Sequence, residues 1–328
     1  MKKTLAILLS LMLALSLCAG ASAEEISGSY SWGVASLGSS AQMVASAIAT
    51  VVTEHYPQLS ISVQATAGSS ENIRLIRNDE IDIANVNDAY NAATAQGAYE
   101  GEPETTLWAL FNMYENAYVV CVLEDSPIQS MDDLVGKRVN LGPAGSGVYN
   151  AAAAMFESYG LLDQITVTTY SYTDANDQLK QGSIDALVGL ISGEVPSTAL
   201  AELDNGTAIR VIPTESERLQ SAYEKYPDYA DGKIHAGCIN AVKEDMQVMA
   251  GFTIEYADER MSDEVAYAIV KTVYENVDQL STYHQIASTL SVDTALNGIP
   301  AIVKVHPGAA KYFKEIGIWR EDLEVAER

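Results

Sequence analysis

The chain has 328 residues, 44 of them acidic and 19 basic, which gives a formal net charge of −25. This balance argues against a nucleic-acid partner, because a protein that binds phosphates needs a basic surface. It also means that an anionic ligand would have to be held by local dipoles, since the overall field repels it. The length exceeds what one simple core usually supports and predicts two lobes.

The N-terminus has the features of a secretion signal. Lys2 and Lys3 precede an uncharged apolar stretch over residues 4–17, and residues 21–23 form a small-residue cleavage site. The apolar stretch is shorter than the roughly 20 residues of a membrane-spanning helix. We therefore expect residues 1–23 to be a cleaved signal peptide and the protein to act at the periplasmic or extracellular face of the cytoplasmic membrane. Cys18 leaves open a lipid anchor, although Leu17 is larger than the residue that usually precedes a lipidated cysteine.

Strand-like and helix-like segments alternate along the rest of the chain, a pattern typical of α/β folds with mostly parallel sheets. The first unit has expected strands at 26–33, 59–65 and 81–86, a helix at 41–55 and another beginning near Ser69.

The same order of elements returns about 105 residues later. We expect strands at 137–141 and 165–170, an Ala-rich helix at 148–159 and a helix beginning near Thr173. Residues 76–82 (IRNDEID) resemble residues 179–185 (LKQGSID), and both end a helix and begin a buried strand with Ile-Asp. This repeat predicts that the chain contains two α/β units.

Segments 116–123 and 249–256 are expected to be strands that pass between the two units. Two such crossings form a hinge around which lobes can close on a ligand. The predicted fold is a two-lobed α/β architecture of the periplasmic-binding-protein type, each lobe a mostly parallel sheet flanked by helices. Lobe 1 would comprise residues 24–118 and 250–328, and lobe 2 residues 119–249.

The sequence has no recognisable residue pattern for catalysis or metal binding. None of the four histidines forms a metal-binding motif with another His, Cys or Glu. The nucleophile-elbow and phosphate-loop patterns are missing. We expect neither an enzyme nor a cofactor or metal. Cys121 and Cys238 leave open a disulfide, which export permits, or two buried thiols.

Three turns rich in Ser and Gly, at 36–40, 68–70 and 145–147, each lead from an expected strand into an expected helix. Unpaired backbone N–H groups and the positive end of the helix dipole suit a carboxylate there. Ordinary helix capping by serine is the alternative for any single turn. In an open α/β sheet such turns meet at the carboxyl ends of the strands, where ligands bind.

Polar residues at the exits of two buried strands are further candidates. Asn87 and Asp88 follow the third strand of lobe 1 and suit the other end of a polar ligand, and Ser192 has the equivalent position in lobe 2. The complete set of expected ligand contacts is Ser36, Ser39, Ser40, Thr66, Ser69, Ser70, Asn87, Asp88, Ser146, Gly147, Val148 and Ser192.

The sequence resembles the solute-binding subunits of tripartite ATP-independent periplasmic (TRAP) transporters, specifically the TAXI branch. The similar segments are 65–73 (ATAGSSENI), 134–147 (LVGKRVNLGPAGSG) and 306–317 (HPGAAKYFKEIG). The resemblance implies a protein that closes on a small organic acid or an amino acid such as glutamate or glutamine. We expect it to be a monomer. It also implies delivery of the solute to a TRAP permease driven by an ion gradient. His306 is expected to be structural, as a helix cap in lobe 1.

Two departures from this family affect the ligand. The first turn lacks the tyrosine pair usual in the family, and Asn87-Asp88 stands where Gln-Ser is usual. A carboxylate at Asp88 would disfavour a second anionic group and could meet an ammonium group, which favours an amino acid. A ligand-sensing receptor of the same fold is the alternative function, and an exported enzyme on this fold is the less favoured one.

Overall fold

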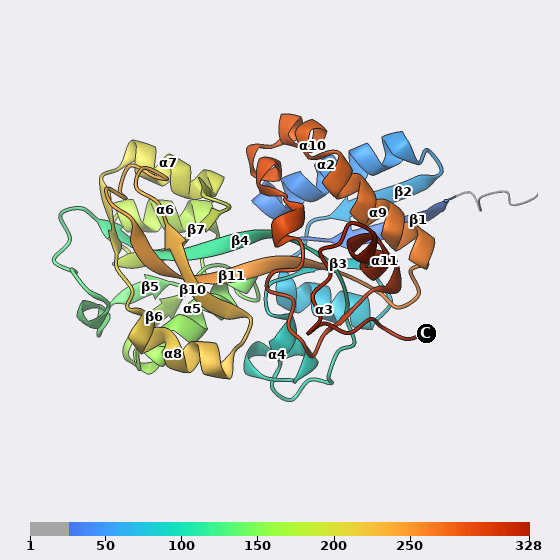
Figure 1. Cartoon of the computed structure of the whole chain (residues 1–328). Helices are drawn as coiled ribbons and strands as arrows, with labels where there is room; N and C mark the ends of the chain where they lie inside the picture. The colour runs from blue at the N-terminus through green and yellow to red at the C-terminus, as the bar shows by residue number, and fades with distance from the viewer. Residues whose placement is uncertain (1–25) are drawn as a thin grey trace, which may run out of the picture.

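The computed structural model describes residues 26–328. The expected signal peptide, its cleavage site and Cys18 lie outside these residues. The molecule has two halves, to the left and right in Figure 1, connected by the long strands β4 (Trp108–Leu123) and β11 (Met246–Ala257).

Lobe 1 is the half on the right in Figure 1, whose hydrophobic core draws on residues 32–114 and 254–323. Its strands and helices are β1 (Gly28–Gly33), α2 (Ser40–His55), β2 (Leu59–Gln64), α3 (Ser69–Arg77), β3 (Ile83–Val86), α4 (Ala89–Ala93), η1 (Gly97–Tyr99), α9 (Asp263–Glu275), α10 (Val277–Tyr283), η4 (Gln285–Thr289), η5 (Val292–Thr294), β12 (Lys304–Val305) and α11 (Pro307–Glu315).

Lobe 2 is the half on the left, with its core residues between positions 117 and 249. Its elements are η2 (Met131–Leu134), β5 (Arg138–Asn140), α5 (Gly147–Ser158), η3 (Leu162–Gln164), β6 (Thr166–Thr168), α6 (Tyr172–Lys180), β7 (Ala186–Ser192), β8 (Val195–Pro196), α7 (Thr198–Gly206), β9 (Ile209–Ile212), α8 (Ser216–Lys225) and β10 (Tyr229–Ile234).

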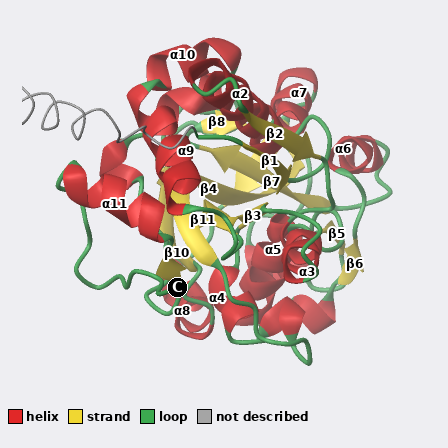
Figure 2. Ribbon diagram, turned by 90° about the vertical axis from the view of Figure 1, so that its right-hand side faces the viewer, coloured by secondary structure: helices red, strands yellow, loops and turns green. Residues whose placement is uncertain are grey.

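The strands form one continuous mixed sheet in the order β2-β1-β3-β11-β4-β7-β5-β6. Pairing is parallel at both ends, where β1 pairs with β2 and β3, and β5 pairs with β6 and β7. It is antiparallel in the middle, because β4 and β11 cross between the lobes in opposite directions and pair with each other. Helices surround the strands when the molecule is viewed from its side (Figure 2). The predicted two-lobed α/β fold class is confirmed.

Side-chain alternation along β4 explains why lobe 2 has two cores. Successive residues of a strand point to opposite faces of the sheet. Tyr118, Val120 and Val122 therefore contribute to one core cluster of lobe 2, under α5 and α8. Ala117 and Val119 contribute to the other, under α6 and α7.

The Ile-Asp repeat has the same structural role in both lobes. Asp82 Oδ2 accepts a 2.7 Å hydrogen bond from the backbone N–H of Ser31, beside the start of β3. Asp185 Oδ2 accepts a 2.8 Å hydrogen bond from the backbone N–H of Arg138, beside the start of β7. Each aspartate thus fixes the first strand of its unit against the third, which explains why the segment recurs.

His306 has the structural role that the sequence suggests. It precedes α11, and its Nδ1 accepts from the N–H of Gly308 at 3.1 Å, while Nε2 lies 3.0 Å from the carbonyl oxygen of Met261. The ring is fully buried and packs edge-on against Trp108. Burial lowers the pKa of His306 to about 4, so the imidazole is neutral at neutral pH.

Candidate functional site

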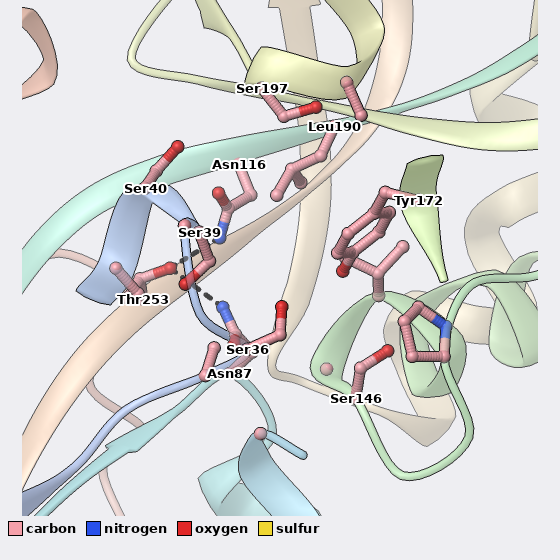
Figure 3. A pocket seen from close by; sticks show the side chains of 18 of the residues that line it. Ser36, Ser39, Ser40, Asn87, Asn116, Ser146, Tyr172, Leu190, Ser197 and Thr253 are labelled. Atoms are coloured by element: carbon pink, nitrogen blue, oxygen red, sulfur yellow. Dashed lines mark hydrogen bonds between the residues drawn. The ribbon is translucent and has the colours of Figure 1, made fainter. Parts of the chain in front are cut away.

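A cavity of about 350 Å³ lies between the two lobes. Both lobes and both crossing strands contribute to its wall, and Figure 3 shows part of the lining. The described residues that line it are Ala35, Ser36, Leu37, Gly38, Ser39, Ser40, Ala41, Ala67, Gly68, Ser69, Asn85, Asn87, Tyr114, Asn116, Tyr118, Pro143, Ser146, Gly147, Val148, Tyr172, Thr173, Leu190, Ser197, Thr198, Ala199, Glu202 and Thr253. A volume of this size suits a small organic molecule.

The turn before α2 supplies serine hydroxyls to the cavity. Ser39 caps the helix, because its side chain accepts from the N–H of Gln42 at 3.2 Å. Gly38 has a φ of 79°, a conformation that glycine adopts without strain and that makes the tight turn possible. Ser36 and Ser40 also line the cavity from this turn.

The turns before α3 and α5 meet across the two lobes. The N–H of Ser70 donates to the carbonyl oxygen of Gly145 at 3.3 Å, and Ser146 caps α5 by accepting from the N–H of Tyr149. A Cβ atom on Gly147 would lie only 2.6 Å from Oδ1 of Asn87. The two lobes are therefore in close contact at this edge of the cavity.

The floor of the cavity is a network of amides and hydroxyls on three strands and the loop after β3. Oγ1 of Thr253 accepts from Nδ2 of Asn87 at 2.9 Å and from Nδ2 of Asn116 at 2.6 Å. Oδ1 of Asn116 in turn accepts from Oγ of Ser192 at 2.7 Å. These bonds, partly visible in Figure 3, join the loop after β3 to β4, β7 and β11 at the wall of the cavity.

A buried glutamate holds one of the lining residues of the cavity in place. Glu255 is fully buried, and its carboxyl accepts from Nε1 of Trp32 at 2.6 Å and from Nδ2 of Asn85 at 2.5 Å. Burial raises the pKa of Glu255 to about 8, although both hydrogen bonds oppose this shift. The carboxyl is therefore mainly protonated at neutral pH, and it fixes the side chain of Asn85 beside the cavity.

Eight of the twelve expected contacts line the cavity: Ser36, Ser39, Ser40, Ser69, Asn87, Ser146, Gly147 and Val148. The other four lie outside the lining. The hydroxyl of Thr66 donates to Oδ1 of Asn72 at 2.7 Å. Oγ of Ser70 accepts from Nδ2 of Asn150, and Oγ of Ser192 donates to Oδ1 of Asn116. These hydroxyls hold the turns and the floor in place.

Asp88 is the fourth residue outside the lining, and its position changes the expected ligand chemistry. It is fully buried and accepts from the hydroxyl of Tyr99 and from Nδ2 of Asn150. The carboxylate expected to meet an ammonium group is therefore directed away from the cavity in this structure.

Sequence reasoning missed the aromatic part of the site. Tyr114 and Tyr118 on β4 and Tyr172 on α6 line the cavity. Together with Leu190, they give one side of the cavity an apolar surface. The signal that could have revealed it is the spacing of Tyr114, Asn116 and Tyr118, which places all three side chains on the same face of a crossing strand.

The charge of the lining is low. Glu202, exposed on α7, is the one charged side chain among the described lining residues. Within the described part of the chain, no group of three or more His, Cys, Asp or Glu side chains could hold a metal ion. Cys121 and Cys238 are both free thiols, so they form no disulfide in this structure; Cys121 is buried as expected, whereas Cys238 is only partly buried. Residues 26–328 include no helix that is long and apolar enough to cross a membrane.

This fold, with a cavity between two lobes, is that of periplasmic solute-binding proteins. The periplasmic aliphatic sulphonate binding protein SsuA of Escherichia coli superposes with a TM-score of 0.50 at 17% identity, over 88% of this chain and 84% of that one. The alkanesulfonate-binding protein SsuA of Xanthomonas axonopodis pv. citri, bound to MOPS, superposes with a TM-score of 0.50 at 12% identity, over 92% and 97%. At these identities the likeness establishes the shared fold. Residues 33–317 match the NMT1-like family, and the chain belongs to this family.

Proposed function

We propose that this protein is the extracytoplasmic solute-binding subunit of a TRAP transporter of the TAXI type. It captures a small carboxylate-bearing solute between its lobes and delivers it to the membrane permease. The observation that carries the proposal is the cavity between the lobes, lined by the three serine- and glycine-rich turns. The lobe boundaries given above, export through residues 1–23, and a monomeric state are part of the same proposal.

The carboxylate would be bound without a basic side chain. The N-termini of α2, α3 and α5 border the cavity, and the hydroxyls of Ser36, Ser40 and Ser69 stand beside them. Backbone N–H groups and the helix dipole at such termini favour an anion. This arrangement is suited to one negative group in a protein whose overall charge is strongly negative.

The rest of the solute would contact tyrosine rings and amides. Because Asp88 is directed away from the cavity, it supplies no partner for an ammonium group in this conformation. Asn87 and Asn116 offer hydrogen bonds to neutral polar groups, and Tyr114 and Tyr172 offer apolar contact. These features favour a monocarboxylic acid with a partly apolar body over a glutamate-like amino acid.

Isothermal titration calorimetry tests the site. The panel contains L-glutamate, L-glutamine, 2-oxoglutarate, short aliphatic and aromatic monocarboxylates, and MOPS. We expect a monocarboxylate to bind, and Ser146→Asp to weaken that binding at least about 100-fold, because the new carboxylate is unpaired beside the anion. Ser262→Asp is the matched control, since Ser262 caps α9 in the same way but lies outside the cavity lining.

Two outcomes would contradict the site assignment. One is that no acid in the panel binds, and the other is that Ser146→Asp binds as tightly as the wild type. The transporter assignment is tested separately by uptake of the identified solute into vesicles that hold the permease. Uptake should require an ion gradient and continue without ATP.

A further inference from the structure

Two buried aspartates lie where the lobes meet, outside the lining of the cavity. Asp88 follows β3 in lobe 1 and is fully buried, and Asp228 precedes β10 in lobe 2 and is 4% exposed. Neither has a role in the proposed binding site. A buried carboxylate without a cation is costly, so its presence needs a physical account.

Each carboxylate accepts hydrogen bonds from the opposite lobe. Oδ2 of Asp88 accepts from Nδ2 of Asn150, on α5, at 2.5 Å. Oδ1 and Oδ2 of Asp228 accept from the backbone N–H groups of Tyr90 and Asn91, on α4, at 2.8 and 3.2 Å. We call these five residues the interlobe latch. The hydrogen bonds run in both directions between the lobes.

The latch lies next to the cavity, because its residues are close in sequence to residues that line the cavity. Asp88 follows Asn87, which lines the cavity and lies against Gly147. Asn150 is on the same helix as Ser146, one turn further along α5. A movement that separates the two lobes at the cavity would therefore also separate Asn150 from Asp88.

Burial disfavours negative charge on the two carboxyls of the latch. The described groups that donate hydrogen bonds to the two carboxyls, and so oppose the effect of burial, are Asn150, the hydroxyls of Tyr99 and Ser69, the backbone N–H of Asp88 and the N–H groups of α4. The hydroxyls of Tyr118, Tyr229 and Tyr256 are close enough for Asp88 and Asp228 to raise their pKa values. Those three hydroxyls and Oδ1 of Asn91 are buried without a hydrogen-bond partner. No cation is among these groups.

We infer that closure of the two lobes is coupled to proton uptake at the Asp88–Asp228 pair, so that acid favours the closed form. In the open form both carboxyls regain water and ionise freely. In the closed form they are desolvated in a region without a cation. The inference concerns the movement of the lobes and holds whichever solute the cavity binds.

The raised pKa values of Asp88 and Asp228 set the direction of the pH effect. Burial raises the pKa of Asp88 to about 6, and burial together with the charge of Asp88 raises the pKa of Asp228 well above its usual value. The closed form is therefore stabilised fully below the usual aspartate pKa of about 4. This stabilisation is lost as the pH rises through about 6, where Asp88 loses its proton, and as Asp228, whose pKa is also raised, loses its own.

Hydrogen exchange at Tyr90 and Asn91 reports on the latch directly. These residues are in the first turn of α4, whose N–H groups have no acceptor within the helix. Their protection in the closed form comes from Asp228. The experiment uses the ligand-free protein at pH 5 and pH 8, with exchange rates normalised to the N–H groups in the interior of α2.

We expect normalised protection of these two amides to fall at least about tenfold from pH 5 to pH 8, because a group with a pKa near 6 loses its proton over this range. The double variant Asp88→Asn/Asp228→Asn should lose this dependence, since both side chains stay neutral. Asp163→Asn, at an exposed site in lobe 2, should behave as the wild type. The radius of gyration from small-angle scattering should rise with pH in the wild type and in Asp163→Asn, and should stay constant in the double variant.

A wild-type protection profile that is flat between pH 5 and pH 8 would overturn the inference. So would a double variant that keeps the tenfold change. If the double variant does not fold, Asp88→Asn alone is measured in the same way, and an unchanged profile in that variant has the same consequence.

Discussion

Nδ2 of Asn116, on β4, donates a 2.6 Å hydrogen bond to Oγ1 of Thr253, on β11. This contact joins the two crossing strands directly beneath the cavity. Both residues are almost fully buried, and both contribute to the lining of the cavity. The same hydroxyl accepts from Asn87, and one atom therefore connects both crossing strands to the loop that follows β3.

Thr253→Val removes this acceptor while keeping the shape of the side chain. The buried amide of Asn116 then lacks a partner, and we expect the free energy of unfolding to fall by about 1–3 kcal/mol. Asn87 keeps its bond to the carbonyl oxygen of Phe252. Urea denaturation measures the effect, and Thr166→Val on the exposed face of β6 is the control. Equal stability of the two variants would show that the network contributes little.

Gly147→Ala should prevent the lobes from closing without unfolding either of them. The added methyl group would lie 2.6 Å from Oδ1 and 2.8 Å from Cβ of Asn87, in the opposite lobe. We expect at least about a tenfold loss of affinity for the solute identified by calorimetry, which corresponds to 1.4 kcal/mol. Gly206→Ala is the control, because a Cβ at that position has open space around it. Unchanged affinity in Gly147→Ala would contradict the tight contact between the lobes.

Glu255 should make the protein less stable as the pH rises. Its pKa is raised to about 8 in the folded protein, so the folded state holds a proton that the unfolded state releases above pH 4.5. The free energy of unfolding should therefore fall between pH 5 and pH 8, by an amount on the order of 3–5 kcal/mol. Glu255→Gln should remove this part of the slope, whereas Glu321→Gln, at an exposed site, should not. Parallel pH profiles for the wild type and Glu255→Gln would disprove the assignment.

His306 should make the protein less stable as the pH falls. Its pKa is lowered to about 4, so its stabilising effect is complete above pH 6.5 and is lost as the pH falls toward 4. The expected loss is about 3 kcal/mol. His306→Asn keeps a capping side chain, lowers stability at pH 7, and should make the decline below pH 6.5 shallower. Thermal unfolding between pH 4 and pH 7 measures this, with the exposed His55→Asn as control.

Much of the fold could be predicted because its signals are local. The Ser and Gly turns stand at the starts of α2, α3 and α5, within one residue of the expected positions. The Ile-Asp repeat correctly indicated two equivalent units, since Asp82 and Asp185 each fix a strand of their own lobe. Serine capping and buried-strand patterns depend on neighbours in the chain, so one sequence is enough to find them.

The direction of individual side chains could not be predicted in the same way. Asn87 and Asp88 are adjacent and both polar, yet one faces the cavity and the other faces Asn150. The difference depends on how lobe 2 packs against the turn. Thr253 is 137 residues from Asn116, and their contact depends on the register of β4 against β11. Local periodicity carries no information about that register.

The two crossing strands also set the order in which the chain can assemble. The core of lobe 2 comes from one continuous stretch between positions 117 and 249, whereas the core of lobe 1 needs residues on both sides of it. β3 pairs with β11, which is made more than 150 residues later. The first half of the chain therefore cannot complete its sheet until the last third has been synthesised. The N-terminal part of the chain therefore stays incompletely folded until the C-terminal segment has been made, which is the state that the export proposed above would require.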